Sequence, residues 1–137
     1  MRFDKLTIKS QELIQNAQSL ASRYGNQQIV NEHLLLAMLE EKEGIARTVL
    51  RKLGVAPDAV RDEIRTAVDR LPKVSGASEV YLSTDTRAAI EKAFDEAAKM
   101  KDEYVSIEHI FLAIADEKTG EAAKILSRAG VTRDSIL

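Results

Sequence analysis

The sequence predicts an all-α fold, in which two pseudo-symmetric four-helix repeats pack into one compact domain spanning residues 1–137. The main observation is an internal repeat. Residues 7–60 align without a gap with residues 83–136, and 15 of the 54 aligned pairs are identical. The apolar residues of each repeat follow helical spacing, and no segment shows a convincing strand pattern. A short linker, about residues 72–82, leaves the two halves close enough to form one body.

The first repeat, about residues 1–72, is expected to begin with a helix that Thr7 caps and Gly25 ends. The threonine hydroxyl can accept one of the unpaired N–H groups at a helix start, and glycine readily adopts the left-handed conformation of a helix end. One face of this helix carries apolar side chains at helical spacing: Ile14, Ala17, Ala21 and Tyr24.

Three further helices are expected in the first repeat. Residues 31–41 are apolar nearly all round, which indicates a central and buried helix. Residues 45–53 form the third helix, which stops before a glycine. Pro57 lies in the first turn of the fourth, where a missing backbone N–H costs little, and Pro72 ends it.

The second repeat, about residues 83–137, shows the same order. Ser83 and Ser106 are placed to cap its first two helices, a third helix ends at Gly130, and Thr132 begins a fourth. This fourth helix has room for about one turn, far less than its counterpart in the first repeat. We therefore expect it to be truncated and the chain to be the front piece of a longer polypeptide.

Composition excludes several classes of function. The net charge of −2 argues against a general nucleic-acid binder, and no apolar run approaches the roughly 20 residues of a membrane span. The absence of cysteine rules out disulfides and thiolate metal sites and fits a reducing cytoplasm. The closest glycines are 10 residues apart, so no phosphate-binding loop can be drawn. We expect no enzyme active site and no cofactor in this chain.

The two histidines occupy equivalent repeat positions, in the pairs Glu32-His33 and Glu108-His109. Two such pairs could in principle bind a metal, but adjacent helical residues point about 100° apart, which suits chelation poorly. The favoured interpretation is that each histidine packs in the first turn of a buried helix, while the glutamate faces solvent near the positive end of the helix dipole. No metal site is expected.

These repeated motifs resemble the N-terminal domain of the Clp family of AAA+ unfoldases. The EHLLLA-like pattern occurs at residues 32–37 and again at residues 108–113. The opening MRFDKLTIKSQE, the stretch NQQIV at residues 26–30 and LPKVSG at residues 71–76 are most similar to the disaggregating ClpB branch of that family. The resemblance covers nearly the whole chain.

The resemblance implies a role for the chain and for a longer parent protein. Such a parent is a hexameric ATPase in the cytoplasm that threads aggregated polypeptides through a central pore together with the DnaK chaperone system. Its ATPase modules, with their ATP and magnesium, would lie beyond residue 137. The N-terminal domain is a mobile, tethered unit that contacts unfolded or aggregated protein, and in isolation we expect it to be monomeric.

The resemblance also suggests site residues, and it leaves two functions open. For substrate handling, the matching positions are Thr7, Asp102 and Glu108, with an apolar seam between the repeats, rimmed by acids, as the binding surface. The alternative is an adaptor or degradation-tag receptor of the ClpA or ClpC type, in which Glu32 and Glu108 would recognise phosphorylated arginine. From the residues alone, Thr7 is also a helix cap and Glu108 a first-turn acid.

The charge distribution bears on the partner. Residues 85–121 contain ten acidic and five basic side chains. This excess would favour basic segments, weakly and in a salt-dependent way, although a surface of this kind is often only solvated.

Overall fold

The computed structural model describes residues 2–75 and 79–137, and in this part of the chain the predicted all-α fold of two similar repeats is confirmed. The middle of the expected linker, residues 76–78, lies outside the described residues. The elements of the first repeat are η1 (Phe3–Lys5), α1 (Ile8–Arg23), β1 (Gln28–Ile29), α2 (Asn31–Glu40), α3 (Ile45–Lys52) and α4 (Pro57–Asp69). The linker ends in β2 (Tyr81–Leu82), and the second repeat contains α5 (Thr84–Lys99), α6 (Ile107–Ala115), α7 (Glu121–Arg128) and α8 (Arg133–Ile136).

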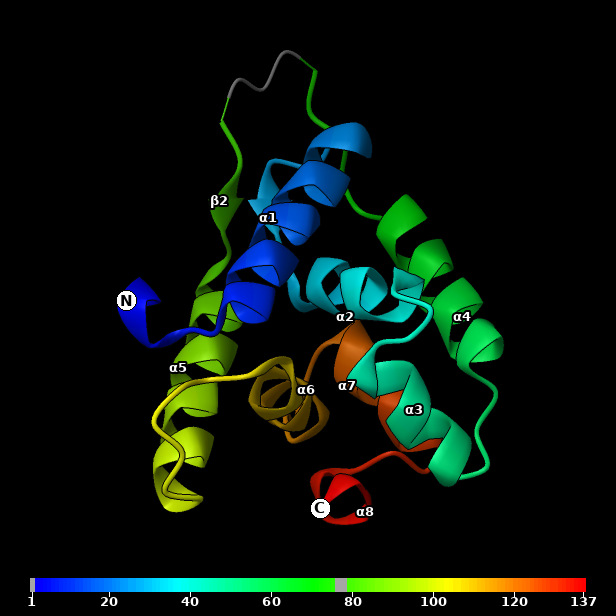
Figure 1. The fold of residues 1–137 in the computed structure, drawn as a ribbon. Coiled ribbons are helices and arrows are strands. Elements are labelled where there is room, and N and C mark those ends of the chain that lie inside the picture. The colour runs from blue at the N-terminus through cyan, green and yellow to red at the C-terminus, as the bar shows by residue number, and fades with distance from the viewer. Residues whose placement is uncertain (1, 76–78) are drawn as a thin grey trace.

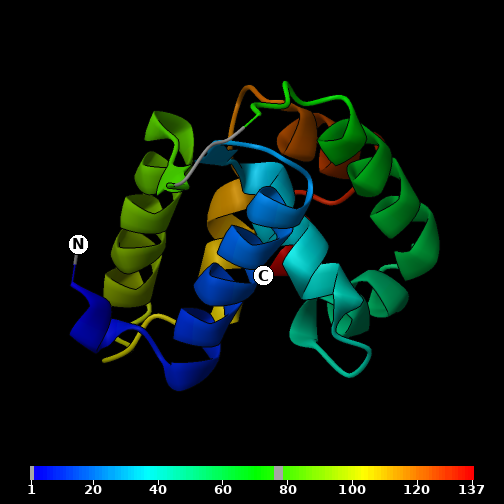
Figure 2. The same ribbon diagram turned by 90° about the horizontal axis from the view of Figure 1, so that it is seen from above.

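The two short apolar helices, α2 and α6, form the centre of the domain. Figures 1 and 2 show them surrounded by the others, with α5 at one edge and α4 at the opposite edge. Helix α1 packs on α2, and α5 packs on α6 in the same way. Their buried side chains supply much of the core: Leu34, Leu35, Leu36, Leu39, Ile110, Phe111, Leu112 and Ile114. The expectation of a central, buried second helix therefore holds in both repeats.

The helix termini follow the sequence signals. The Thr7 hydroxyl accepts a hydrogen bond from the Ser10 backbone N–H at 3.1 Å, and the Ser83 hydroxyl accepts the corresponding bond from Thr86. Gly25, with φ of 73°, adopts the left-handed conformation that a side chain disfavours. These local signals set where α1 and α5 begin and where α1 ends.

The expectation that the chain has no strand is wrong in a small way. β1 and β2 pair in parallel over two residues each, and a single bridge joins Leu6 to Val105. Two-residue pairs are too short to show the alternation of apolar and polar residues that marks a strand in a sequence. The β1–β2 pair ties the end of the linker to the loop between α1 and α2.

Helix α8 is anchored to α5 by a partly buried ion pair. The Arg133 guanidinium donates to both oxygens of Glu96, at 2.6 and 2.9 Å, and the Glu96 side chain is 2% exposed. The hydrogen bonds from Arg133 lower the pKa of Glu96 below its ordinary value. Within residues 2–75 and 79–137, no helix is long and apolar enough to cross a membrane.

Candidate functional site

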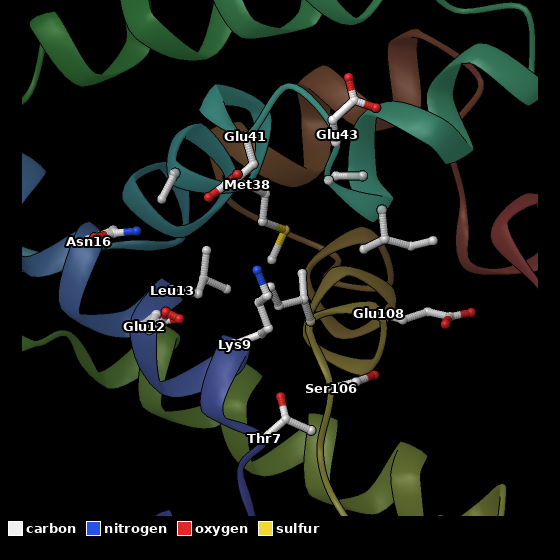
Figure 3. A pocket seen from close by; sticks show the side chains of 15 residues that line it. Thr7, Lys9, Glu12, Leu13, Asn16, Met38, Glu41, Glu43, Ser106 and Glu108 are labelled. Carbon is white, nitrogen blue, oxygen red and sulfur yellow. The ribbon is translucent and has the colours of Figure 1, made fainter.

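A groove of about 560 Å³ lies at the junction of the two repeats. Its walls are the first turns of α1, the turn between α2 and α3, and the start of α6 (Figure 3). The residues that line it are Thr7, Lys9, Glu12, Leu13, Asn16, Ala37, Met38, Glu41, Glu43, Gly44, Ile45, Ala46, Ser106, Ile107 and Glu108. The groove is therefore built by both repeats together.

The groove combines an apolar floor with an acidic rim. Leu13 and Met38 are almost fully buried, whereas Ile45, the first residue of α3, is 38% exposed and is available to a ligand. The rim carries four glutamates and a single cationic side chain, Lys9. Figure 3 shows Met38 and Leu13 directed into the hollow, while Glu43 and Glu108 point outward from it. This arrangement suits an apolar segment whose neighbours carry positive charge.

A tight turn shapes the upper wall of the groove. The Gly44 N–H donates to the Glu41 carbonyl at 3.1 Å, and a Cβ at Gly44 would lie only 3.0 Å from the Glu41 Cβ. The buried Arg47 of α3 donates to the carbonyl of Leu39, at the end of α2, and pairs with Asp58 at 2.8 Å. These bonds hold the turn against α3 and α4.

Thr7 serves as the cap of α1 and also lines the groove. We expect Thr7→Ala to cost about 0.5–2 kcal/mol of stability, because the Ser10 N–H loses its acceptor. Thr7→Ser keeps that acceptor and should retain both stability and ligand binding. Urea unfolding and peptide titration of the two variants measure this. If Thr7→Ser folds normally but no longer binds, the methyl group rather than the hydroxyl is the important part of Thr7.

Both histidines are buried helix-start residues, as the packing interpretation predicted. His33 Nδ1 accepts the Val30 N–H at 2.9 Å, and His109 Nδ1 accepts the Ser106 N–H at the same distance. Because Nδ1 accepts, Nε2 carries the proton in the neutral ring and donates to a second partner. Among residues 2–75 and 79–137, no group of three or more His, Cys, Asp and Glu side chains is placed to hold a metal ion.

The second partners of the histidines also occupy equivalent positions. His33 Nε2 lies 2.9 Å from Asn26 Oδ1, and His109 Nε2 lies 2.9 Å from Asp102 Oδ2. Asn26 in addition donates to the Pro72 carbonyl and so links His33 to the linker. The structure therefore gives Asp102 a structural contact, and Asp102 is not among the residues that line the groove.

The resemblance grouped Asp102 with Thr7 and Glu108, and the structure gives Asp102 a stabilising partner of its own, His109. Thr7 and Glu108 share the groove, but Asp102 does not. We expect Asp102→Ala to cost about 1 kcal/mol, because the nearly buried His109 N–H loses an acceptor that is itself half exposed. Asp102→Asn, which copies the first repeat, should stay close to the wild-type stability in urea unfolding. Equal destabilisation by alanine and asparagine would contradict the role of this hydrogen bond.

Glu32 and Glu108 are equivalent in sequence but lie in different surroundings. Glu108 is exposed at the rim of the groove, whereas Glu32 lines a smaller crevice of about 180 Å³ together with Asp85 and Glu117. Partial burial raises the pKa of Glu32 above its ordinary value, and Glu121 and Asp85 raise it further. The structure does not bring Glu32 and Glu108 together.

Sequence reasoning did not single out the apolar residues of the groove. Leu13, Met38, Ile45 and Ile107 follow ordinary helical core spacing, and only the fold shows that they face a hollow. The one usable signal was Ile45, an isoleucine at the first position of a short helix, directly after a glycine.

The fold and the groove define a duplicated helical domain that offers a binding surface between its repeats. Residues 5–129 match the family described as Clp repeat (R) N-terminal domain. The chain therefore belongs to the Clp N-terminal domain family, as the sequence motifs predicted.

Similar proteins agree with this assignment. Chaperone protein ClpB of Bacillus cereus is 33% identical over 100% of this chain and 16% of its own length. ClpB of Porphyromonas gingivalis is 39% identical over 96% of this chain and 15% of its own. The chain thus spans about one sixth of these relatives.

Solved structures share the fold. The Hsp104 N-terminal domain from Candida albicans matches with a TM-score of 0.85 at 22% identity, covering 96% of this chain and 86% of that one. A complex of the ClpV N-domain with a VipB peptide matches with a TM-score of 0.78 at 17% identity, covering 97% and 82%.

Proposed function

We propose that this domain binds exposed apolar segments of unfolded or aggregated polypeptides in the groove between its repeats. The observation that carries the proposal is the apolar floor, with the accessible Ile45, inside a rim of glutamates. Two findings support it. The sequence relatives are ClpB chaperones, and a similarly folded ClpV N-domain forms a complex with a peptide.

The charge of the rim gives the proposed ligand a preference. Glu12, Glu41, Glu43 and Glu108 surround the apolar floor, opposed by Lys9 alone. Apolar segments flanked by lysine or arginine should therefore bind more tightly than segments flanked by acids. Because these rim charges are exposed, the preference should weaken as salt screens them.

The role in a longer protein belongs to the same proposal. In a ClpB-type hexameric ATPase of the cytoplasm, the domain would capture client segments and help deliver them to the pore, with DnaK acting on the same aggregates. ATP and magnesium would serve the motor and not this domain. Six tethered copies raise the effective concentration of binding sites, so weak binding by each groove is sufficient.

A direct titration tests the proposal. A fluorescently labelled peptide with a leucine- and valine-rich centre flanked by lysines is titrated with the domain, and the same centre flanked by aspartates serves as the matched control. We expect saturable binding of the first peptide and weaker binding of the second. Equal binding of both, or of neither, would contradict the proposed site. In the same preparation we expect a monomer without ATP turnover.

A second candidate function is recognition of phosphorylated arginine. The crevice around Glu32 supplies carboxylates for the guanidinium group, since Asp85 and Glu117 also line it, whereas no basic side chain lines it to meet the phosphate. A guanidinium group would pair with these carboxylates. A phosphoarginine peptide that competes with the unfolded client, and whose binding Glu32→Ala and Glu108→Ala abolish, would support a tag receptor. If the phosphoarginine peptide does not compete with the unfolded client for the domain, the first function is favoured.

A further inference from the structure

The crevice around Glu32 is the second-repeat counterpart of the groove. Nine of the eleven residues that line it stand 76 positions from a groove residue. Despite this equivalence, its volume is about 180 Å³, compared with about 560 Å³ for the groove. Because the helices are arranged alike at both sites, the difference in volume must come from the side chains.

The C-terminal ends of α2 and α6 are held by ion pairs from different sides. The end of α6 pairs with α5, whereas the end of α2 pairs with α4. In the second repeat, Lys92 of α5 reaches across to Asp116 at the end of α6. Its Nζ lies 2.7 Å from the Asp116 carboxylate and 3.4 Å from the Asp116 carbonyl. This bridge joins α5 to the end of α6, and neither Lys92 nor Asp116 is among the residues that line the crevice.

In the first repeat the residue at the Lys92 position is Asn16, which lines the open groove and is too short to cross it. The residue at the Asp116 position is Glu40, which instead faces Arg65 of α4 at 3.6 Å. The end of α2 is also held from the far side by Arg47, whose counterpart in the second repeat is Ala123. The anchors thus leave the side facing α1 free.

We infer that the residue at the Asn16/Lys92 position decides which of the two equivalent grooves is open to polypeptide. Asparagine at position 16 leaves the first groove unbridged, and the Lys92–Asp116 ion pair narrows the second. This inference rests on the proposed function for its binding readout. The bridge itself can be tested without any ligand.

The test transfers the bridge into the open groove. Asn16→Lys should place its ammonium group within reach of Glu40, and a crystal structure of this variant should show that ion pair. Binding of the lysine-flanked apolar peptide should weaken about three- to fivefold, the factor that corresponds to an exposed ion pair that the ligand must break. Methionine is similar in length to lysine but uncharged. The affinity of Asn16→Met for the same peptide should therefore lie within about 1.5-fold of the wild-type affinity.

Two further variants separate bridging from simple charge repulsion. Glu40 does not line the groove, so Glu40→Gln alone should leave binding unchanged. Combined with Asn16→Lys it should restore binding if the bridge is the cause, whereas repulsion of the cationic peptide would persist. Lys92→Met, in the other repeat, should leave binding in the groove unchanged, and a crystal structure of this variant should show a wider crevice around Glu32.

The outcomes distinguish the inference from the proposed function. If wild type does not bind the peptide, the proposed function fails, while the crystal structure of Asn16→Lys still decides whether the bridge forms. If wild type binds and Asn16→Lys forms no bridge, or binds as tightly as wild type, the inference is overturned and the proposed function stands.

Discussion

Replacing Ile45 by glutamine is expected to remove most of the affinity of the domain for an apolar peptide without unfolding it. Ile45 is the first residue of α3, lies on the groove and is 38% exposed, so a bound segment would cover its remaining apolar surface. Losing that burial should weaken binding about tenfold, or about 1.4 kcal/mol. Because the position is partly exposed and glutamine adds no charge, stability should change by about 0.5 kcal/mol or less.

The matched control for this substitution is Ile8→Gln. Ile8 is also an isoleucine at the first position of a helix, α1, but it is 75% exposed and does not line the groove. It should therefore bind the peptide like wild type. Peptide affinity and urea unfolding are measured for both variants. Equal losses in the two would mean that the ligand does not lie on the floor of the groove.

Acidification from about pH 7 to about pH 5 should cost the domain about 2 kcal/mol through His33. Burial lowers the pKa of His33 from 6.5 to about 4. Between these values the unfolded chain binds a proton that the folded chain excludes, so stability falls as the pH falls. The contribution is complete above about pH 6.5 and is lost as the pH drops through about 4.

Glu32 acts in the opposite direction, because its raised pKa favours the folded state at lower pH and offsets part of the loss. The measurement is urea unfolding across this range for wild type and for His33→Gln. Glutamine at this third helical position can accept the Val30 N–H, as in a capping box. The variant should show a flatter pH dependence. If the free energy of unfolding of the variant depends on pH as steeply as that of wild type, His33 is not the cause of the acid destabilisation.

Much of the fold could be predicted because its signals are local. The helix starts depend on hydroxyls within three residues, as at Thr7 and Ser83, and the buried helices show their apolar character directly. The internal repeat then predicted that the second half would copy the first. The β1–β2 pair was missed because two residues carry no periodicity.

The candidate site was harder to predict because it depends on contacts between the repeats. The family resemblance named Thr7 and Glu108, which both line the groove, and an apolar seam between the repeats, but it did not name the residues of the apolar floor. The hydrogen bond of Asp102 was not predicted, since only the fold shows that His109 turns its second nitrogen toward it. The difference between Asn16 and Lys92 likewise could not be interpreted from the sequence, because only the fold shows that Lys92 reaches the end of α6 and that Asn16 lines the groove.

The central claim is that polypeptide binds between α1, the α2–α3 turn and the start of α6. Its most direct test is an NMR titration of the isotopically labelled domain with the lysine-flanked apolar peptide. We expect the largest shifts of backbone amides to cluster at residues 7–16, 37–46 and 106–108, and Ile45→Gln to suppress them. Shifts centred instead on the crevice around Glu32 or on the face between α4 and α7, with the groove amides unchanged, would contradict it.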